Sequence, residues 1–176
     1  MLNKFIERPI DINCFLIELQ LNINQVKDKL INDIEKGILD EDNMNHKTNV
    51  NGKMTSWKYF NNNLNFHNLL DIGFNEIKKY VKLEPSFLYD SWGIKINKND
   101  YTAYHNHSDT TYSGILYLNN FEEPINFPQY NLSITPKEGT FLFFSALLEH
   151  GVDKNTKDTV KYAIPFNILK NKPWNN

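Results

Sequence analysis

The second half of the chain is a series of short apolar runs separated by turn residues, and this spacing limits the folds open to it. The runs recur about every ten residues and are rich in β-branched and aromatic side chains. They cover Phe87–Ile96, Tyr101–His107, Gly114–Leu118, Ile125–Ile134, Thr140–Phe144 and Lys161–Ile168. Strands at this spacing are typical of antiparallel sandwiches and barrels. We therefore expect a jelly-roll core over residues 86–168.

Two segments before this region have the apolar periodicity of helices. In Gln25–Gly37 apolar residues recur every four positions, with Asn24 placed to cap the start and Gly37 to suit the end. A second helix fits Asn68–Val81, and Pro85 prevents its continuation. Since each segment has one apolar face, we expect both helices to pack on one face of a single sheet.

The other N-terminal segments are less regular. Phe5–Leu21 is apolar and is expected to form one or two short strands or an extended arm. Leu39–Asn65 is polar and rich in Asn, and it is long for a connection inside a compact domain. Disorder is one interpretation of this segment, and a lid or substrate loop containing Gly52 and Trp57 is the other. We predict a single domain over residues 1–176, with the N-terminal strands and helices in 1–85.

Composition and charge exclude several classes of function. The chain has 176 residues, of which 40% are hydrophobic, enough for one domain with a real core. The net charge of −2 and the absence of a dense Lys run disfavour nucleic-acid binding. The lone Cys14 excludes an internal disulfide, and no long apolar span or signal peptide opens the chain. We expect a cytoplasmic protein without a membrane partner, in the host cytoplasm if the source is viral.

Metal-ligating residues gather at two places in the predicted core. His105 and His107 are two apart on a predicted strand, so their side chains should share a face, and Asp109 follows at the same spacing. His150 comes after a later apolar strand. A third ligand from a distant strand closes such a site. Three ligands on one face of an octahedron leave three positions for a bidentate co-substrate and dioxygen, as in non-haem Fe(II) oxygenases.

Five motifs also occur in the order found in the 2-oxoglutarate/Fe(II)-dependent dioxygenases. They are Asp100–His107, Ser113–Asn119, Pro136–Phe144, His150–Val152 and Lys161–Asn167, within residues 87–168. The chain most resembles the bacterial and phage 2-oxoglutarate/Fe(II) oxygenases with an H-x-H … S-G-x-Y-Y-L … H-G-V … F-N pattern. It is more distantly similar to prolyl hydroxylases. The resemblance implies a double-stranded β-helix, Fe(II) as the metal, and 2-oxoglutarate as a co-substrate that is split to succinate and CO2 while a substrate C–H is hydroxylated.

The resemblance implies metal-ligand roles for His107 and His150 and leaves the third ligand open. The family's H-x-D pattern fits His107 with Asp109. The position after the Tyr-rich strand instead fits His105 as the first ligand, with His107 in place of the carboxylate. Whichever of His105 and Asp109 is not a ligand is expected to be a hydrogen-bond partner of one.

The resemblance also implies which residues hold the co-substrate. In the family, a basic residue on the strand after the last His binds the distal carboxylate of 2-oxoglutarate, and Lys161 occupies that position. The only arginine, Arg8, lies far from every motif, so a point charge replaces the usual bidentate fork. Tyr117 matches the tyrosine that donates its hydroxyl to the same carboxylate in prolyl hydroxylases. No catalytic residue beyond the metal ligands is implied.

We therefore expect an Fe(II)- and 2-oxoglutarate-dependent hydroxylase acting on a small metabolite or on a residue of a peptide or protein. The competing hypothesis is a cupin-like metal-binding domain, or a structural jelly roll without activity. Apolar residues in the N-terminal arm would suit a symmetric homodimer. The segment Leu39–Asn65 is the candidate for substrate contact or closure.

Overall fold

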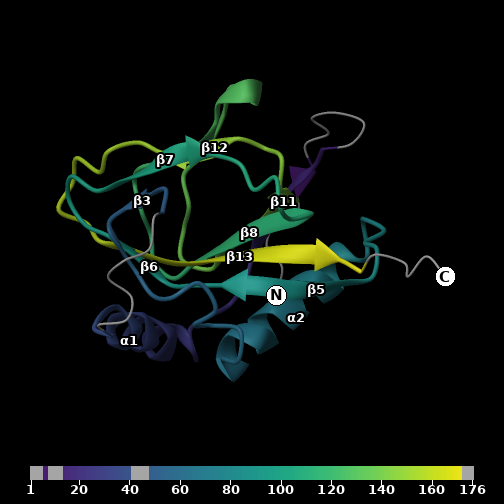
Figure 1. The fold of residues 1–176 in the computed structure, drawn as a ribbon, viewed down its shortest axis with the longest axis horizontal. Coiled ribbons are helices and arrows are strands. Elements are labelled where there is room, and N and C mark those ends of the chain that lie inside the picture. The colour runs from purple at the N-terminus through teal and green to yellow at the C-terminus, as the bar shows by residue number, and fades with distance from the viewer. Residues whose placement is uncertain (1–5, 8–13, 41–47, 172–176) are drawn as a thin grey trace.

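The structure is a computed structural model that describes residues 6–7, 14–40 and 48–171. Its strands form two antiparallel sheets, and the two helices lie beneath the larger one (Figure 1). The large sheet contains, in spatial order, β1 (Ile6–Glu7), β2 (Leu16–Gln20), β11 (Thr140–Ser145), β8 (Tyr112–Tyr117), β13 (Lys161–Lys170), β6 (Ile94–Ile96) and β4 (Lys53–Met54), while β5 (Ser86–Ser91) also pairs with β13. The small sheet contains β10 (Leu132–Ile134), β9 (Ile125–Phe127), β12 (His150–Val152), β7 (Tyr101–His105) and β3 (Val50–Asn51). The expected jelly-roll arrangement is thus confirmed.

The large sheet is buried on both faces, which explains the unbroken apolar run in β11. Leu142 and Phe144 point between the two sheets, whereas Phe141 and Phe143 point toward the helices. Neighbouring β8 alternates in the same way, with Tyr117 facing the small sheet and Leu116 the helices. Because successive strand residues face opposite sides, a strand between two apolar layers needs no polar positions.

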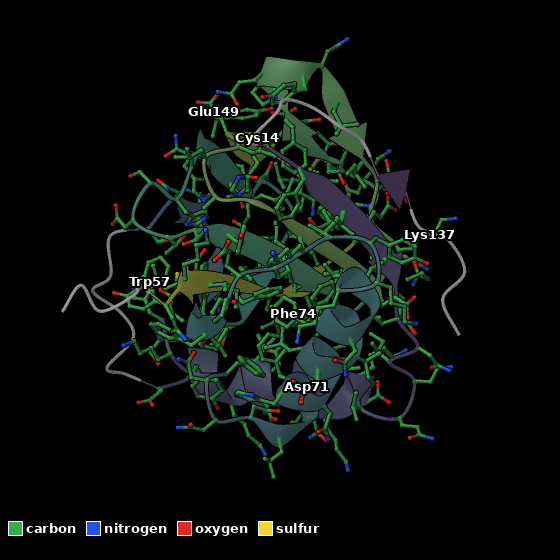
Figure 2. All side chains as sticks on the ribbon, turned by 90° about the vertical axis from the view of Figure 1, so that its right-hand side faces the viewer. Cys14, Trp57, Asp71, Phe74, Lys137 and Glu149 are labelled. Atoms are coloured by element: carbon green, nitrogen blue, oxygen red, sulfur yellow. The ribbon has the colours of Figure 1, made fainter. Side chains whose placement is uncertain are left out.

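Both helices pack on the outer face of the large sheet, as their apolar stripes predict. Helix α1 spans Lys27–Ile38 and helix α2 spans Leu64–Ile77. Phe74 of α2 lies between the helix and the sheet (Figure 2), where its ring contacts the rings of Phe141, Phe143 and Phe166. No helix among the described residues, α1 and α2 included, is long and apolar enough to cross a membrane.

Two predicted features of α1 are wrong. Asn24 does not cap the helix, because the carbonyl of Ile23 already accepts hydrogen bonds from the amides of Val26 and Lys27. Gly37 does not end the helix, which continues to Ile38. A Cβ atom at Gly37 would lie 2.6 Å from the ring of Tyr59, so the glycine permits close packing instead.

The long polar segment is ordered over the residues that the structure describes in it. Residues 41–47 lie outside the described residues. After them, β3 pairs with β7 of the small sheet, and β4 pairs with β6 of the large sheet. Gly52 separates these two strands, so this short connection joins the two sheets. Disorder therefore does not describe residues 48–65.

The packing of α1 on the sheet predicts a contrast between two apolar residues of the same segment. Ile34 is fully buried and lies against Gly93, whereas Leu39 is 80% exposed. Ile34→Ala should lower the free energy of unfolding by about 2–5 kcal/mol, because it leaves a cavity under the sheet. Leu39→Ala should change it by less than about 0.5 kcal/mol. Urea denaturation of both variants measures the difference, and equal effects would contradict this packing.

Candidate metal centre

Three histidines from two distant parts of the chain meet between the two sheets. His105 ends β7 and His150 begins β12, and the two residues are directly paired across these strands. His107 follows two residues after His105. The potential ligand atoms of the three side chains all lie within 4.8 Å of one another. Their ring centroids are 4.5 Å apart for His105 and His150 and 5.3 Å apart for His107 and His150.

A β-bulge in β7 determines which other side chains of this strand line the cavity with His105. His150 pairs with His105, but Val152 pairs with Thr102, so β7 holds one more residue than β12 over this stretch. The extra residue reverses the normal alternation. Thr102 and His105 therefore line the same cavity although they are three residues apart.

His107 and Asp109 do not continue the strand, contrary to the predicted range. The strand ends at His105, and the backbone amide of His107 donates to the carbonyl of Ala146 at 2.8 Å. The chain then turns, and the amide of Thr110 donates back to the carbonyl of His107. Asp109 is exposed, and its carboxylate accepts a hydrogen bond from the Ser108 hydroxyl. The structure thus brings His105, and not Asp109, together with His107 and His150.

Backbone carbonyls orient two of the three imidazoles. Nδ1 of His105 lies 2.8 Å from the carbonyl oxygen of Ala103, and Nδ1 of His150 lies 2.9 Å from that of Leu148. A carbonyl oxygen only accepts hydrogen bonds, so each Nδ1 carries the proton and each Nε2 keeps its lone pair for a metal. The partners that orient these two rings are therefore main-chain groups and not the carboxylate of Asp109, which the sequence offers either as a ligand or as a hydrogen-bond partner of one.

Burial keeps the three imidazoles neutral at pH 7. Desolvation lowers the pKa of His150 to about 3 and that of His107 to about 4, and it also lowers the pKa of His105. The neighbouring imidazoles add to the effect at His107 and His150. Neutral imidazole is the form that binds a transition metal. Three of them facing one point fit Fe(II) or a similar divalent ion.

Lys161 lines the same cavity as the three histidines. It is the first residue of β13 and is 2% exposed. Its ammonium lies 5.9 Å from the centroid of the Tyr117 ring and 5.3 Å from that of Phe121, and among the described residues it forms no ion pair. Burial lowers the pKa of Lys161 to about 8. A buried cation without a partner is unfavourable, so the cavity fits an anionic ligand.

Other polar atoms in the cavity also lack partners. The indole N–H of Trp92 and the hydroxyl of Thr102 are buried and unpaired among the described residues, and both side chains line the cavity. Burial raises the pKa of Tyr117, which keeps its phenol protonated as a donor. These residues line the same cavity as Lys161, so the cavity offers several polar donors to an anion.

Sequence reasoning missed Trp92 and Thr102 as cavity residues. Thr102 stands at an odd spacing from His105, and regular alternation would place it on the opposite face of the strand. Trp92 lies between β5 and β6, where a tryptophan is usually a core residue. No pattern in the sequence marks either position.

No protein-family model matches the sequence, and neither does any curated protein. Solved structures do match. The viral collagen prolyl hydroxylase vCPH from Paramecium Bursaria Chlorella virus-1, in its 2OG complex, is 18% identical over 89% of this chain and 96% of that chain, with a TM-score of 0.64. HygX from Streptomyces hygroscopicus, with nickel and 2-oxoglutarate bound, is 12% identical over 88% and 82%, with a TM-score of 0.65. EctD from S. alaskensis, with bound Fe, is 11% identical over 90% and 78%, with a TM-score of 0.68.

The fold is a double-stranded β-helix. This confirms the fold class expected from the strand spacing and from the motifs. At 11–18% identity, these likenesses establish the fold alone, because one fold can carry many different reactions.

The third metal ligand can be identified by comparing two substitutions. His105→Ala should weaken Fe(II) or Co(II) binding by about 100-fold, because loss of a ligand leaves only two imidazoles. Asp109→Ala should change the affinity by less than about threefold, since its carboxylate faces solvent. Anaerobic calorimetric titration measures both. The reverse ranking would show that Asp109 is a ligand and His105 is not.

Proposed function

We propose that this protein is an Fe(II)- and 2-oxoglutarate-dependent oxygenase. His105, His107 and His150 would hold the metal, and Lys161 would bind the distal carboxylate of 2-oxoglutarate with the help of Tyr117. The observation that carries the proposal is the buried, unpaired ammonium of Lys161 in the same cavity as three neutral imidazoles. The likeness in fold to proteins with iron, nickel or 2-oxoglutarate bound supports it.

The bound metal and co-substrate supply the oxidation, in which 2-oxoglutarate, dioxygen and a substrate C–H give succinate, CO2 and a C–OH. The protein's own residues bind and orient these reactants. Lys161 offsets the charge of one carboxylate, and Tyr117 donates its hydroxyl to it. Thr102 and Trp92 offer two further donors to an anion in the chamber.

The aromatic surroundings of His150 exclude water and fix its ring. The ring centroid of His150 lies 4.9 Å from that of Phe144 and 5.9 Å from that of Phe127. These two ring contacts limit rotation of the imidazole, which helps to hold its Nε2 in position for a metal. A dry chamber also strengthens the attraction between Lys161 and an anion.

A site of three imidazoles carries one more positive charge than the usual site of two histidines and a carboxylate. With Lys161 nearby, the cavity is strongly electropositive once a divalent ion is bound. This favours an anionic co-substrate. A cupin-like metal domain without a co-substrate is not favoured, because it gives no account of the buried lysine.

The class of substrate is a separate question. The viral neighbour is named a collagen prolyl hydroxylase, and HygX has been solved with hygromycin B bound. By analogy, a peptide residue or a small metabolite is proposed as the substrate here. We also propose that residues 1–176 act as one domain, since β2 pairs with β11 of the jelly-roll core.

The proposed activity predicts a specific spectrum. Anaerobic addition of Fe(II) and 2-oxoglutarate should give a weak visible charge-transfer band, and His150→Ala should abolish it. Lys161→Met should weaken 2-oxoglutarate binding about 10- to 100-fold, the usual cost of losing one charged hydrogen bond. The exposed Lys157 offers a matched control, and Lys157→Met should leave the binding unchanged. A wild-type protein without the band would refute the proposed function.

The pKa of Lys161 predicts how co-substrate binding depends on pH. Because burial lowers this pKa to about 8 in the free protein, the ammonium is charged below pH 8 and loses its proton above it. Affinity for 2-oxoglutarate should therefore be constant from pH 6.5 to 7.5 and fall by up to about tenfold per pH unit above 8. Titrations of the Co(II)-loaded protein measure this, and Lys161→Met should show no such fall.

A further inference from the structure

A second cavity adjoins the metal centre on the side of β5. This outer groove is lined by Trp57, Tyr89, Asp90, His107, Asp109 and Asn167, among others. His107 and Asn167 also line the inner cavity that holds Lys161. A molecule in the outer groove would therefore lie directly beside a proposed metal ligand.

Asp90 is a buried carboxylate that lines the outer groove. It is 8% exposed, and its Oδ1 accepts one hydrogen bond, of 2.9 Å, from the side-chain amide of Asn167. Among the described residues it forms no ion pair. Burial raises the pKa of Asp90, and the charge of Lys58, whose ammonium lies 5.2 Å from the centroid of the Tyr89 ring, lowers it. The charged form of a buried carboxylate with a single donor is unfavourable, and a cation beside it would stabilise that form.

A second β-bulge turns Asp90 toward the groove. Asp90 pairs with Asn167 and Leu88 pairs with Ile168, so Tyr89 is an extra residue in β5. Regular alternation would place Leu88 and Asp90 on the same face. Instead, Leu88 packs against the core between the large sheet and the helices, and Asp90 lines the outer groove beside Asn167. Bulges often occur beside active sites because they redirect a side chain in this way.

Two of the residues that line the groove, Tyr89 and Trp57, are aromatic and suit an organic cation. Tyr89 is 40% exposed, so its ring is accessible. The indole of Trp57 packs edge-on against Trp92, at 4.6 Å between centroids, and Trp92 itself lines the inner cavity. Aromatic faces attract ammonium groups, and the attraction is larger where water is excluded.

We propose that the outer groove binds the alkylammonium group of the substrate, with Asp90 as its counter-ion and the rings of Tyr89 and Trp57 as its walls. The proposal rests on the proposed function, because it takes the molecule beside His107 to be the one that is oxidised. The substrate would then be an amine, either a free metabolite or a lysine side chain.

The test is an NMR titration of the full-length, metal-free protein with n-butylammonium chloride and, at equal ionic strength, with the neutral isostere 1-butanol. Butylammonium should give saturable shifts in the outer groove and bind at least about tenfold more tightly than 1-butanol. Nα-acetyl-lysine methylamide is titrated in parallel. Asp90-dependent binding of either amine supports the proposal, and the tighter of the two identifies the source of the amine.

Two isosteric substitutions make the test specific. Asp90→Asn retains an oxygen to accept from Asn167 but removes the charge, and it should weaken butylammonium binding by about tenfold or more. Asp109→Asn removes an exposed charge from the same groove and should weaken it by less than about threefold. Equal loss in both variants, unchanged binding in Asp90→Asn, or equal affinity for 1-butanol would each overturn the proposal.

A third variant covers the case in which Asp90→Asn does not fold. Tyr89→Leu changes an exposed wall and should weaken butylammonium binding about threefold without lowering the melting temperature. Unchanged binding would overturn the proposal. The titration needs neither Fe(II) nor 2-oxoglutarate, so a negative result leaves the charge-transfer test of the proposed function unaffected. If the wild-type protein binds the amine but gives no charge-transfer band, the proposed function alone would be refuted.

Discussion

The pairing of β7 with β12 is the constraint on which the rest of the site depends. It sets His105 opposite His150, two residues that lie far apart in the chain. Because the pair lies between the two sheets, both rings are desolvated and stay neutral, and nearby carbonyls fix their tautomers. Lys161 enters the same chamber from the large sheet. The two sheets thus contribute different chemistry, with ligands from one and charge from the other.

Much of the fold and part of the site follow from regular periodicity in the sequence. The spacing of the short strands and the two amphipathic helices are of this kind. The motifs pointed to His107 and His150 as ligands, and the sequence left the choice between His105 and Asp109 open. Predictions from the sequence were incomplete where the hydrogen-bond pairing of the strands is irregular. One bulge brings Thr102 to the face of His105, and the other separates Asp90 from Leu88. A bulge depends on pairing between distant strands, so the local sequence contains no mark of it.

The inner cavity and the outer groove differ in the sign of their charge. Lys161 lines the first and Asp90 lines the second, and neither forms an ion pair with any of the described residues. Asn167 stands between them, accepting a hydrogen bond from Ser113 at 2.7 Å and donating to Asp90. Such a division would direct an anion and an ammonium group to separate chambers on either side of His107. Opposite charges in adjacent chambers also disfavour binding of either molecule in the wrong place.

The connection at Gly52 bears on how wide the inner cavity is. Its two short strands belong to different sheets, so the backbone there sets the separation of the sheets at one end. A Cβ atom at Gly52 would lie 2.8 Å from Ile96 and 3.0 Å from the carbonyl of Lys95, which leaves little slack. The register of His105 and His150 is set elsewhere, in β7 and β12. Lengthening or shortening this connection is therefore a route by which evolution or design can resize the chamber while the metal ligands keep their positions.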